Sequence, residues 1–355
     1  MKPILSTEYS IFFKEDAYQR LNNYLTENKT SKVFILVDEN TREFCLPTLR
    51  KKLNDNIIFE IIEIKEGEVH KNIKTCVEVW KTLTKFEADR KSILINLGGG
   101  MVSDLGGFVA STYKRGIRFI NIPTTLLSMV DASVGSKTGV DLDNLKNLVG
   151  LFSDPEMVLI DTSYLNTLKE REMRSGIAEV IKYGLTFDDN LLVKVKKYKW
   201  KVNNDLNDII YRSIIIKNDV VLKDFKEKNL RKVLNFGHTA GHAIESYFLN
   251  HSTLPSLTHG EAIAIGMVIE AYISHKIYNF PIDELESLKS YIQKTFGRIL
   301  IPQENYDDIL KLMKHDKKNS DGNINYILLK NVADFVIDGR APLSLVIDGF
   351  NYYNS

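Results

Sequence analysis

The sequence predicts an α/β domain built on a parallel sheet at residues 1–165, followed by an all-helical domain at residues 166–355. Three observations lead to this prediction. Strand-like and helix-like segments alternate in the first part of the chain, a glycine-rich turn follows one of the strands, and helical patterns dominate from about residue 161 onward. Strands that alternate with helices are typical of parallel sheets covered by helices.

Four short apolar runs in the first part have the length and composition of buried strands. They lie at residues 33–37, 57–64, 92–97 and 117–122. Residues 71–85, between the second and third runs, carry apolar side chains at helical spacing. This order of elements supports the α/β prediction.

The second part of the chain contains long helical patterns and few strand-like runs. The predicted helices lie at residues 191–202, 208–224, 239–248, 259–275 and 282–296. The segment 261–272 is apolar on nearly all sides, which indicates a helix at the centre of this domain.

Composition excludes several classes of function. The 355 residues include 47 Lys and Arg against 46 Asp and Glu, so the net charge is only +1. This balance predicts neither a nucleic-acid partner nor a membrane surface. The first residues become polar too early for a signal peptide, and no apolar run reaches about 18 residues. We therefore expect a cytoplasmic protein, in which Cys45 and Cys76 are reduced thiols.

The glycine-rich turn at residues 98–100 closes a strand and opens a helix. Glycines let a backbone approach a pyrophosphate, and amides at a helix N-terminus favour its charge. The turn does not match GxGxxG, so a tight turn without a ligand is the alternative.

A polar segment at residues 131–139 contains Lys137 within Gly-Ser-Lys-Thr. A serine stands before the lysine, so the segment fails the P-loop pattern GxxxxGK[ST]. Hydroxyl, amide and ammonium groups could still grip a phosphate or carboxylate here. A solvated connection is the alternative.

Four of the seven histidines fall between residues 238 and 259, and three of these are candidate metal ligands. His238 and His242 are four residues apart on one face of a helix, and His259 opens the next helix. Imidazole is a common ligand of divalent metals, and a catalytic zinc site needs three protein ligands. The metalloprotease pattern HExxH is absent because Thr239 follows His238. A pair of packed core histidines is the alternative.

Glu179 lies in an otherwise apolar helical stretch. A carboxylate in such surroundings needs a counter-charge or a metal. It is therefore a candidate metal ligand, and an internal ion pair with Lys182 is the alternative.

These features occur together with several longer motifs. In chain order the motifs are GGGMVSDLGGF, TYKRG, PTTLL, VDASVGSKTGV, KNLVG, REMRSGIAEVIKYG, LNFGHTAGHAIE and HGEAIAIGM. With them the chain resembles the 3-dehydroquinate synthase family over nearly its whole length, most densely at residues 97–185 and 231–266. One departure is Ser136, because the family commonly has glycine at this position.

The resemblance implies a Rossmann-like N-terminal domain that binds NAD and a C-terminal domain that holds Zn²⁺ or Co²⁺. It implies that Glu179, His238 and His259 are the metal ligands and that His242 relays protons. The positions similar to NAD contacts of the family are Asp38, Asn40, Glu68, Lys71, Gly99, Gly100, Met101, Asp104, Thr124, Thr125, Lys137, Lys146 and Thr167.

The resemblance also implies a sugar-phosphate substrate, 3-deoxy-D-arabino-heptulosonate 7-phosphate. The positions similar to substrate contacts are Arg115, Asp131, Lys137, Asn147, Lys182, Lys217, Arg231, Asn235 and either Lys317 or Lys318, of which we favour Lys317. Arg115 resembles an arginine that the family supplies from the neighbouring subunit, which implies a homodimer.

The implied reaction forms 3-dehydroquinate through transient oxidation by NAD, β-elimination of phosphate, reduction, ring opening and aldol closure. Two related activities are alternatives: a sugar-phosphate cyclase of other specificity, and a metal-dependent polyol dehydrogenase. A non-catalytic NAD-binding protein is a third, although the complete set of candidate residues argues against it. The intact pair Lys146-Asn147 favours dehydroquinate synthesis over an aminocyclitol-type reaction.

Overall fold

The computed structural model describes residues 1–355 apart from 29, 143–144, 200–201, 252–253 and 315–323. The chain forms two compact units. The first comprises Met1–Lys169 and Lys201–Leu222, and the second comprises Glu170–Trp200 and Lys223–Ser355. The chain therefore passes from one unit to the other three times. Among the described residues, no helix combines the length and the apolar character needed to cross a membrane.

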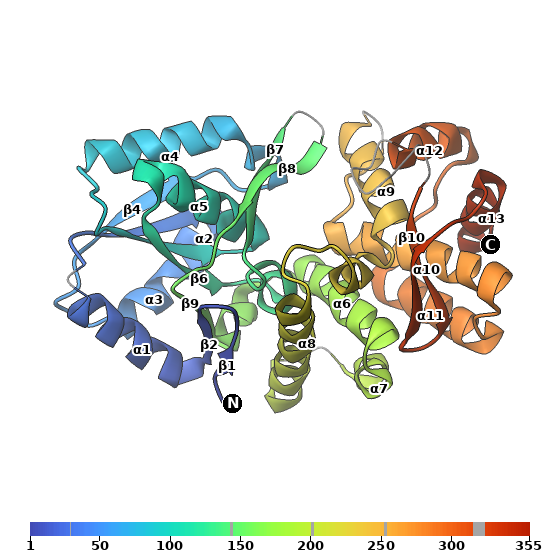
Figure 1. Ribbon diagram of the computed structural model, residues 1–355, viewed down its shortest axis with the longest axis horizontal. Helices are drawn as coiled ribbons and strands as arrows, with labels where there is room; N and C mark the ends of the chain where they lie inside the picture. Colours follow the sequence, from blue (N-terminus) through green and yellow to red (C-terminus); the bar gives the residue numbers. More distant parts are fainter. Residues whose placement is uncertain (29, 143–144, 200–201, 252–253, 315–323) are drawn as a thin grey trace. The chain divides into compact units, whose positions relative to one another are not determined.

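The first unit is built on a seven-stranded sheet with the order β1-β2-β9-β6-β5-β3-β4 (Figure 1). The strands are β1 (Ile4–Leu5), β2 (Ser10–Phe13), β3 (Val33–Asp38), β4 (Phe59–Ile64), β5 (Ile93–Gly98), β6 (Arg118–Pro123) and β9 (Met157–Ile160). Every neighbouring pair is parallel except β1 with β2. The four strands expected from the apolar runs all form, which confirms the parallel sheet.

Helices cover both faces of this sheet, with α4 and α5 on one side and α1 and α3 on the other (Figure 1). The helices of the unit are α1 (Lys14–Glu27), α2 (Glu39–Phe44), α3 (Leu46–Lys52), α4 (Ile73–Lys85), α5 (Gly100–Thr112) and α8 (Asn204–Lys223). Phe34 and Leu36 of β3 pack with Val79 of α4 and Leu105 of α5 in one buried cluster. Burial of such side chains, each worth about 1.5–3 kcal/mol, holds the layers together.

The polar segment around Lys137 is not a plain connection. Lys137 begins strand β7 (Lys137–Leu142), which pairs in antiparallel fashion with β8 (Leu145–Phe152). Gly139 lies opposite Gly150 in this hairpin. A Cβ on Gly150 would press against the carbonyl of Thr138, so the two strands approach closely because glycine stands there.

The second unit is helical. It contains α6 (Glu170–Thr186), α7 (Asp189–Lys197), α9 (His238–Asn250), α10 (His259–Tyr278), α11 (Ile282–Phe296), α12 (Tyr306–Lys314) and α13 (Leu343–Asn354). Helix α10 is buried from Gly260 to Ala271 and packs against α6, α9, α11 and α13. This confirms the central helix that the apolar segment 261–272 predicted.

One hairpin in the second unit was not expected. Strands β10 (Tyr326–Asn331) and β11 (Asp334–Gly339) pair in antiparallel fashion, and β10 packs against α10. The apolar run that forms β10 is short, and periodicity cannot assign such a run to a strand or a helix.

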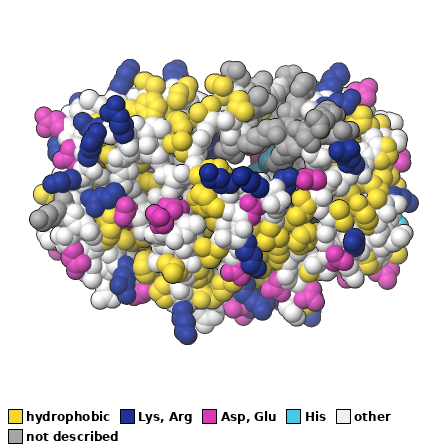
Figure 2. All heavy atoms as spheres, in the orientation of Figure 1, with side chains coloured by type: hydrophobic (Ala, Val, Ile, Leu, Met, Phe, Trp, Pro, Cys, Tyr) yellow, Lys and Arg dark blue, Asp and Glu magenta, His cyan; other side chains and the backbone are white. Residues whose placement is uncertain are grey.

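Basic and acidic side chains are interspersed over the described part of the face shown in Figure 2. This distribution agrees with the near-neutral net charge. Lys and Arg do not gather there into one broad basic area of the kind that binds nucleic acid.

Candidate active site

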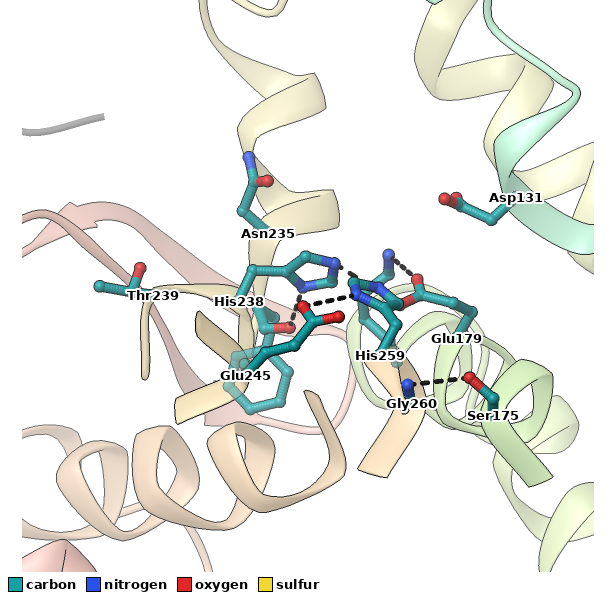
Figure 3. Close-up of polar contacts among 12 residues, drawn as sticks. Asp131, Ser175, Glu179, Asn235, His238, Thr239, Glu245, His259 and Gly260 are labelled. Carbon is teal, nitrogen blue, oxygen red and sulfur yellow. Dashed lines mark hydrogen bonds and ion pairs between the residues drawn. The ribbon is translucent and has the colours of Figure 1, made fainter. Parts of the chain in front are cut away.

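Three helices of the second unit bring two imidazoles and a carboxylate together (Figure 3). His238 is the first residue of α9, His259 is the first residue of α10, and Glu179 lies inside α6. The Oε1 atom of Glu179 is 3.5 Å from Nε2 of His238 and 3.4 Å from Nε2 of His259. Glu179 is completely buried, so its carboxylate faces these two rings instead of solvent.

This geometry fits a divalent metal. Ligand atoms about 2.0–2.1 Å from a tetrahedral zinc ion lie about 3.4 Å from one another. The separations of 3.4 and 3.5 Å therefore leave room for an ion among the three ligand atoms. Two nitrogens and one oxygen also match the ligand types that a catalytic zinc site uses.

Hydrogen-bond acceptors behind the two rings orient them. Nδ1 of His238 lies 3.1 Å from the carbonyl oxygen of Phe236, and Nδ1 of His259 lies 3.3 Å from Oε2 of Glu245 (Figure 3). A proton held on Nδ1 leaves Nε2 with its lone pair directed toward Glu179. Such partners are typical of histidines that bind metals.

Sequence reasoning missed Glu245. It is buried, and it lies seven residues after His238, which puts it on the same face of α9. This spacing is a signal that could have identified the carboxylate. Burial lowers the pKa of His259, but the charge of Glu245 and the contacts with Glu179 outweigh that effect and raise the pKa to about 9. A metal would compete with this proton.

His242 also lies beside the cluster. Each of His238, His242 and His259 offers a ligand atom, and these atoms lie within 4.8 Å of one another. The rings of His238 and His242 are 5.1 Å apart between centroids. Geometry alone thus allows His242 either to approach a metal or to act next to it on a substrate.

The ammonium group of Lys182 contacts Oε2 of Glu179, one helical turn away on α6. Both side chains are buried. The two interpretations of Glu179 are therefore compatible, because one carboxylate oxygen pairs with Lys182 while the other faces the histidines.

A 3₁₀ helix before α9 (Leu230–Asn235) contains Arg231 and Asn235, two of the predicted substrate contacts. The carboxylate of Asp224 accepts hydrogen bonds from the backbone N–H groups of Lys228, Asn229 and Arg231 at 2.9, 2.7 and 3.0 Å. The Arg231 guanidinium donates to the carbonyl of Phe225 at 2.6 Å. Asn235 donates to Oε1 of Glu227 at 2.6 Å.

The start of α9 is fixed from α10. Oε2 of Glu270 accepts from the backbone N–H of Gly237 at 2.8 Å, and Oε1 accepts from Thr239 and Ala240 at 3.1 and 3.2 Å. Glu270 is completely buried. Sequence reasoning also missed this residue, because its position in an apolar helix carries no motif.

A second group of candidate residues lies at the carboxyl edge of the sheet in the first unit. Asp38 ends β3 and caps α2, Gly99 caps α5 after β5, and the N–H of Thr124 after β6 donates to the carbonyl of Gly98 at 3.0 Å. Strands β3 and β5 are neighbours at the point where the strand order reverses. Crevices at such switch points bind dinucleotides in doubly wound folds.

Most other predicted cofactor contacts lie at the starts of elements that follow these strands. Asn40 is in α2, and its side chain contacts Glu66. Gly100 and Met101 are the first two residues of α5. Thr125 follows β6, and Thr167 ends the 3₁₀ helix after β9. Cys45 makes side-chain hydrogen bonds with Thr124 and Thr167, which ties two of these segments together.

Lys71 connects several further candidate residues. Its ammonium group donates to Oδ2 of Asp104 and to Oδ1 of Asn147, both at 2.6 Å, and lies 3.6 Å from Glu68. Lys146 approaches the same Glu68 oxygen at 3.9 Å. Burial lowers the pKa of Lys71, but the carboxylates of Asp104 and Glu68 outweigh it and hold the pKa above its usual range.

The remaining predicted substrate contacts in the first unit are Asp131, Lys217 and Arg115. Lys217 donates to both the backbone carbonyl and Oδ1 of Asp131, each at 2.7 Å. Arg115 is exposed in a turn, with φ at +68°. Lys317 and Lys318 lie outside the described residues.

Comparisons with known proteins identify the family of this chain. Residues 61–175 match the family model described as 3-dehydroquinate synthase N-terminal, and residues 176–319 match the one described as 3-dehydroquinate synthase C-terminal. A 3-dehydroquinate synthase from Parabacteroides distasonis is 39% identical over 98% of both chains.

Two solved structures share the fold. ValA, a 2-epi-5-epi-valiolone synthase from Streptomyces hygroscopicus with NAD⁺ and Zn²⁺ bound, matches with a TM-score of 0.87 at 24% identity, over 99% of this chain and 98% of that one. A 2-deoxy-scyllo-inosose synthase complexed with carbaglucose-6-phosphate, NAD⁺ and Co²⁺ matches with a TM-score of 0.84 at 23% identity, over 99% of both chains.

Proposed function

Because this chain belongs to the 3-dehydroquinate synthase family, we propose that it converts 3-deoxy-D-arabino-heptulosonate 7-phosphate into 3-dehydroquinate and inorganic phosphate. This reaction belongs to the shikimate pathway of aromatic amino-acid biosynthesis. The observation that carries the proposal is the cluster of His238 and His259 around the buried carboxylate of Glu179, in a chain that is similar to a family member over 98% of its length.

The enzyme uses NAD and a divalent metal, Zn²⁺ or Co²⁺. The metal ligands in this proposal are Glu179, His238 and His259, and the separations of their ligand atoms support the assignment. NAD would lie along the carboxyl edge of the sheet, near Asp38, Gly99 and Thr124, with Lys71 and Asp104 beside it. When bound, NAD supplies a hydride acceptor and donor, while the metal polarises a substrate hydroxyl.

The chain's own side chains bind the charged substrate and move its protons. The substrate carries a phosphate and a carboxylate, which explains why a near-neutral chain needs several cationic side chains to bind it. We assign this binding to Arg115, Lys137, Lys182, Lys217, Arg231 and Lys317, with Asp131, Asn147 and Asn235 as polar contacts.

His242 is assigned the proton relay. Its ring lies one helical turn beyond His238, at 5.1 Å between centroids, so it can reach a hydroxyl held next to the metal. The geometry that supports this role also supports a direct contact with the metal, and a pair of histidine variants described below separates the two.

We further propose that the enzyme is a cytoplasmic homodimer in which Arg115 serves the neighbouring subunit. The exposed position of Arg115 in a turn supports this assignment, because the guanidinium is available to another chain. Gel filtration combined with light scattering would measure the mass, and a monomer under assay conditions would contradict the proposal.

The decisive assay measures inorganic phosphate released from the heptulosonate phosphate by the purified protein with catalytic NAD⁺ and Zn²⁺, while absorbance of NADH is followed. We expect phosphate release without net NADH, because the hydride is returned to the substrate. Steady accumulation of NADH with polyols, and no phosphate release, would instead assign a dehydrogenase. Phosphate release from another sugar phosphate alone would assign a different cyclase.

A further inference from the structure

The backbone just before Lys137 adopts an unusual conformation. Gly135 and Ser136 are consecutive residues with positive φ, at +100° and +64°. Glycine tolerates this region, whereas the Cβ of a serine crowds the following carbonyl. Ser136 is also buried, with 5% of its surface exposed. A strained, buried serine therefore immediately precedes a predicted substrate contact.

Several hydrogen bonds hold this turn in place. The hydroxyl of Ser136 donates to Oδ1 of Asp154, and the hydroxyl of Thr7 donates to the same oxygen at 2.9 Å. The carbonyl of Ser136 accepts from the N–H of Ser153 at 2.8 Å, and the N–H of Gly135 donates to the Tyr9 hydroxyl at 3.0 Å. Every partner belongs to the first unit.

The serine side chain makes the contact with Asp154 and also a hydrogen bond with the Tyr9 hydroxyl. A hydroxyl bonded to a carboxylate is among the stronger hydrogen bonds in proteins, so it can offset the crowding at Ser136. Lys137 and Phe152 are opposite each other at the start of the β7–β8 hairpin. Asp154, two residues beyond Phe152, thus closes the end of the hairpin from which Lys137 extends.

We propose that Ser136 and Asp154 form a positioning pair that holds the backbone of Lys137 for the substrate. The pair touches neither substrate nor cofactor in this proposal and acts through Lys137. The proposal rests on the function proposed above, since Lys137 is assigned there to the substrate. It predicts that the two side chains are coupled, so that loss of Asp154 matters only while position 136 carries a side chain.

The test is a set of variants assayed for phosphate release. We expect Asp154→Ala and Ser136→Ala each to lower kcat/KM about tenfold, within the range typical of residues in direct contact. In Ser136→Gly the turn is free of crowding, so adding Asp154→Ala should change kcat/KM less than about twofold. Bound zinc should stay at the wild-type level in every variant, because the proposed metal ligands lie in the second unit.

The control is Asp89→Ala. Asp89 accepts a hydrogen bond from the Ser31 hydroxyl in the same unit, just before β5 and away from the 135–137 turn. Its loss should lower stability without lowering kcat/KM. The proposal is overturned if Asp154→Ala has the same effect in the serine and glycine proteins, or if Asp89→Ala lowers kcat/KM as much.

Hydrogen exchange of the amides at residues 133–140 gives a readout that does not depend on activity. Ser136→Ala and Asp154→Ala should both accelerate exchange there, and the double variant should exchange no faster than either single one. If the wild type releases no phosphate, the proposed reaction is wrong, while this exchange cycle still decides whether the pair holds the turn. Unchanged exchange in the single variants would refute the pair.

Discussion

The two oxygen atoms of the Glu179 carboxylate make different interactions. Its Oε2 atom contacts Lys182, and its Oε1 atom faces the Nε2 atoms of His238 and His259. All of this occurs without exposure of the carboxylate to solvent. Buried charges of this kind are stable only while each has its partners, so the residue serves stability and metal binding together.

Replacing Glu179 by alanine should therefore have two effects. Bound zinc, measured by mass spectrometry of the purified protein, should fall well below one ion per chain because a ligand is lost. The free energy of unfolding should drop by about 3–5 kcal/mol, since Lys182 stays buried without its carboxylate. Full zinc occupancy in a folded Glu179→Ala protein would contradict the ligand assignment.

A pair of histidine variants separates a ligand from a proton relay. His238→Ala should lose both zinc and turnover. His242→Ala should keep zinc at one per chain and lose turnover by about 10²–10⁴-fold, the usual contribution of a general acid–base group. Zinc content and phosphate release would be measured on the same samples. Full turnover in His242→Ala would remove the relay role, and loss of zinc would make His242 a ligand.

At the scale of elements, a residue in the middle of α10 fixes the start of α9, where the predicted ligand His238 lies. Gly237, the residue before α9, has φ at +79°. It has no side chain that could accept hydrogen bonds from the first backbone N–H groups of the helix. The carboxylate of Glu270 in α10 instead accepts hydrogen bonds from the backbone N–H groups of Gly237, Thr239 and Ala240. A negative charge at this end of a helix is also favoured by the helix dipole.

Glu270→Ala should therefore destabilise the protein more than an ordinary cap variant. We expect a loss of about 3 kcal/mol in the free energy of unfolding, because buried N–H groups lose a charged acceptor. The control is Asp188→Ala, which removes the cap of α7 (Asp188 accepts from the N–H of Leu191 at 3.0 Å) and should cost about 1 kcal/mol. Urea unfolding measures the free energy of unfolding of both variants. Equal decreases would show that Glu270 contributes no more than an ordinary helix cap.

The loop that precedes α9 should make stability depend on pH. Burial raises the pKa of Asp224, but hydrogen bonds from Lys228, Asn229 and Arg231 outweigh it and hold the pKa below its usual value. The ordinary aspartate pKa is about 3.9, so the contribution of Asp224 is present above that pH and is lost as the pH falls further.

Urea unfolding between pH 3 and 6 tests this effect. The wild type should lose stability on acidification more steeply than Asp224→Asn, whose side chain does not titrate. Asp348→Asn, which removes an exposed carboxylate in the second unit, is the control for the loss of one negative charge. Parallel curves for wild type and Asp224→Asn would show that Asp224 contributes nothing to the acid response.

At the scale of the whole molecule, α8 belongs to the first unit although α6 and α7, which precede it, belong to the second. It buries Leu206, Ile209, Ile210, Ile214, Val220 and Val221. Its polar side chains also reach distant segments, since Lys217 pairs with Asp131 and Asn218 donates to the carbonyl of Leu5 at 2.9 Å. The first unit therefore includes α8, which follows two helices of the second unit in the sequence.

A fragment comprising residues 1–169 should consequently fail to fold cooperatively. Loss of six buried apolar side chains removes on the order of 10 kcal/mol, which is as large as the whole stability of a typical domain. Adding residues 204–223 through a flexible glycine–serine linker should restore a cooperative transition. Circular dichroism during heating measures this, and a sharp transition in the 1–169 fragment would show that α8 is dispensable.

The sequence alone determined the features that depend on local order. Apolar runs with strand or helix periodicity predicted the parallel sheet and the buried helix α10, because secondary structure follows from spacing along the chain. The long motifs predicted the family, the metal and the nucleotide for the same reason, since each motif keeps several chemical groups at fixed spacing.

Only the tertiary structure decided which distant groups meet. Glu245 and Glu270 carry no motif, and their roles became visible once α9 and α10 were packed against each other. The assignment of α8 and the bond from Ser136 to Asp154 also join segments that are separated in the chain. The physical reason is that burial and hydrogen bonding depend on proximity in space, and a sequence pattern records proximity only along one helix or one strand.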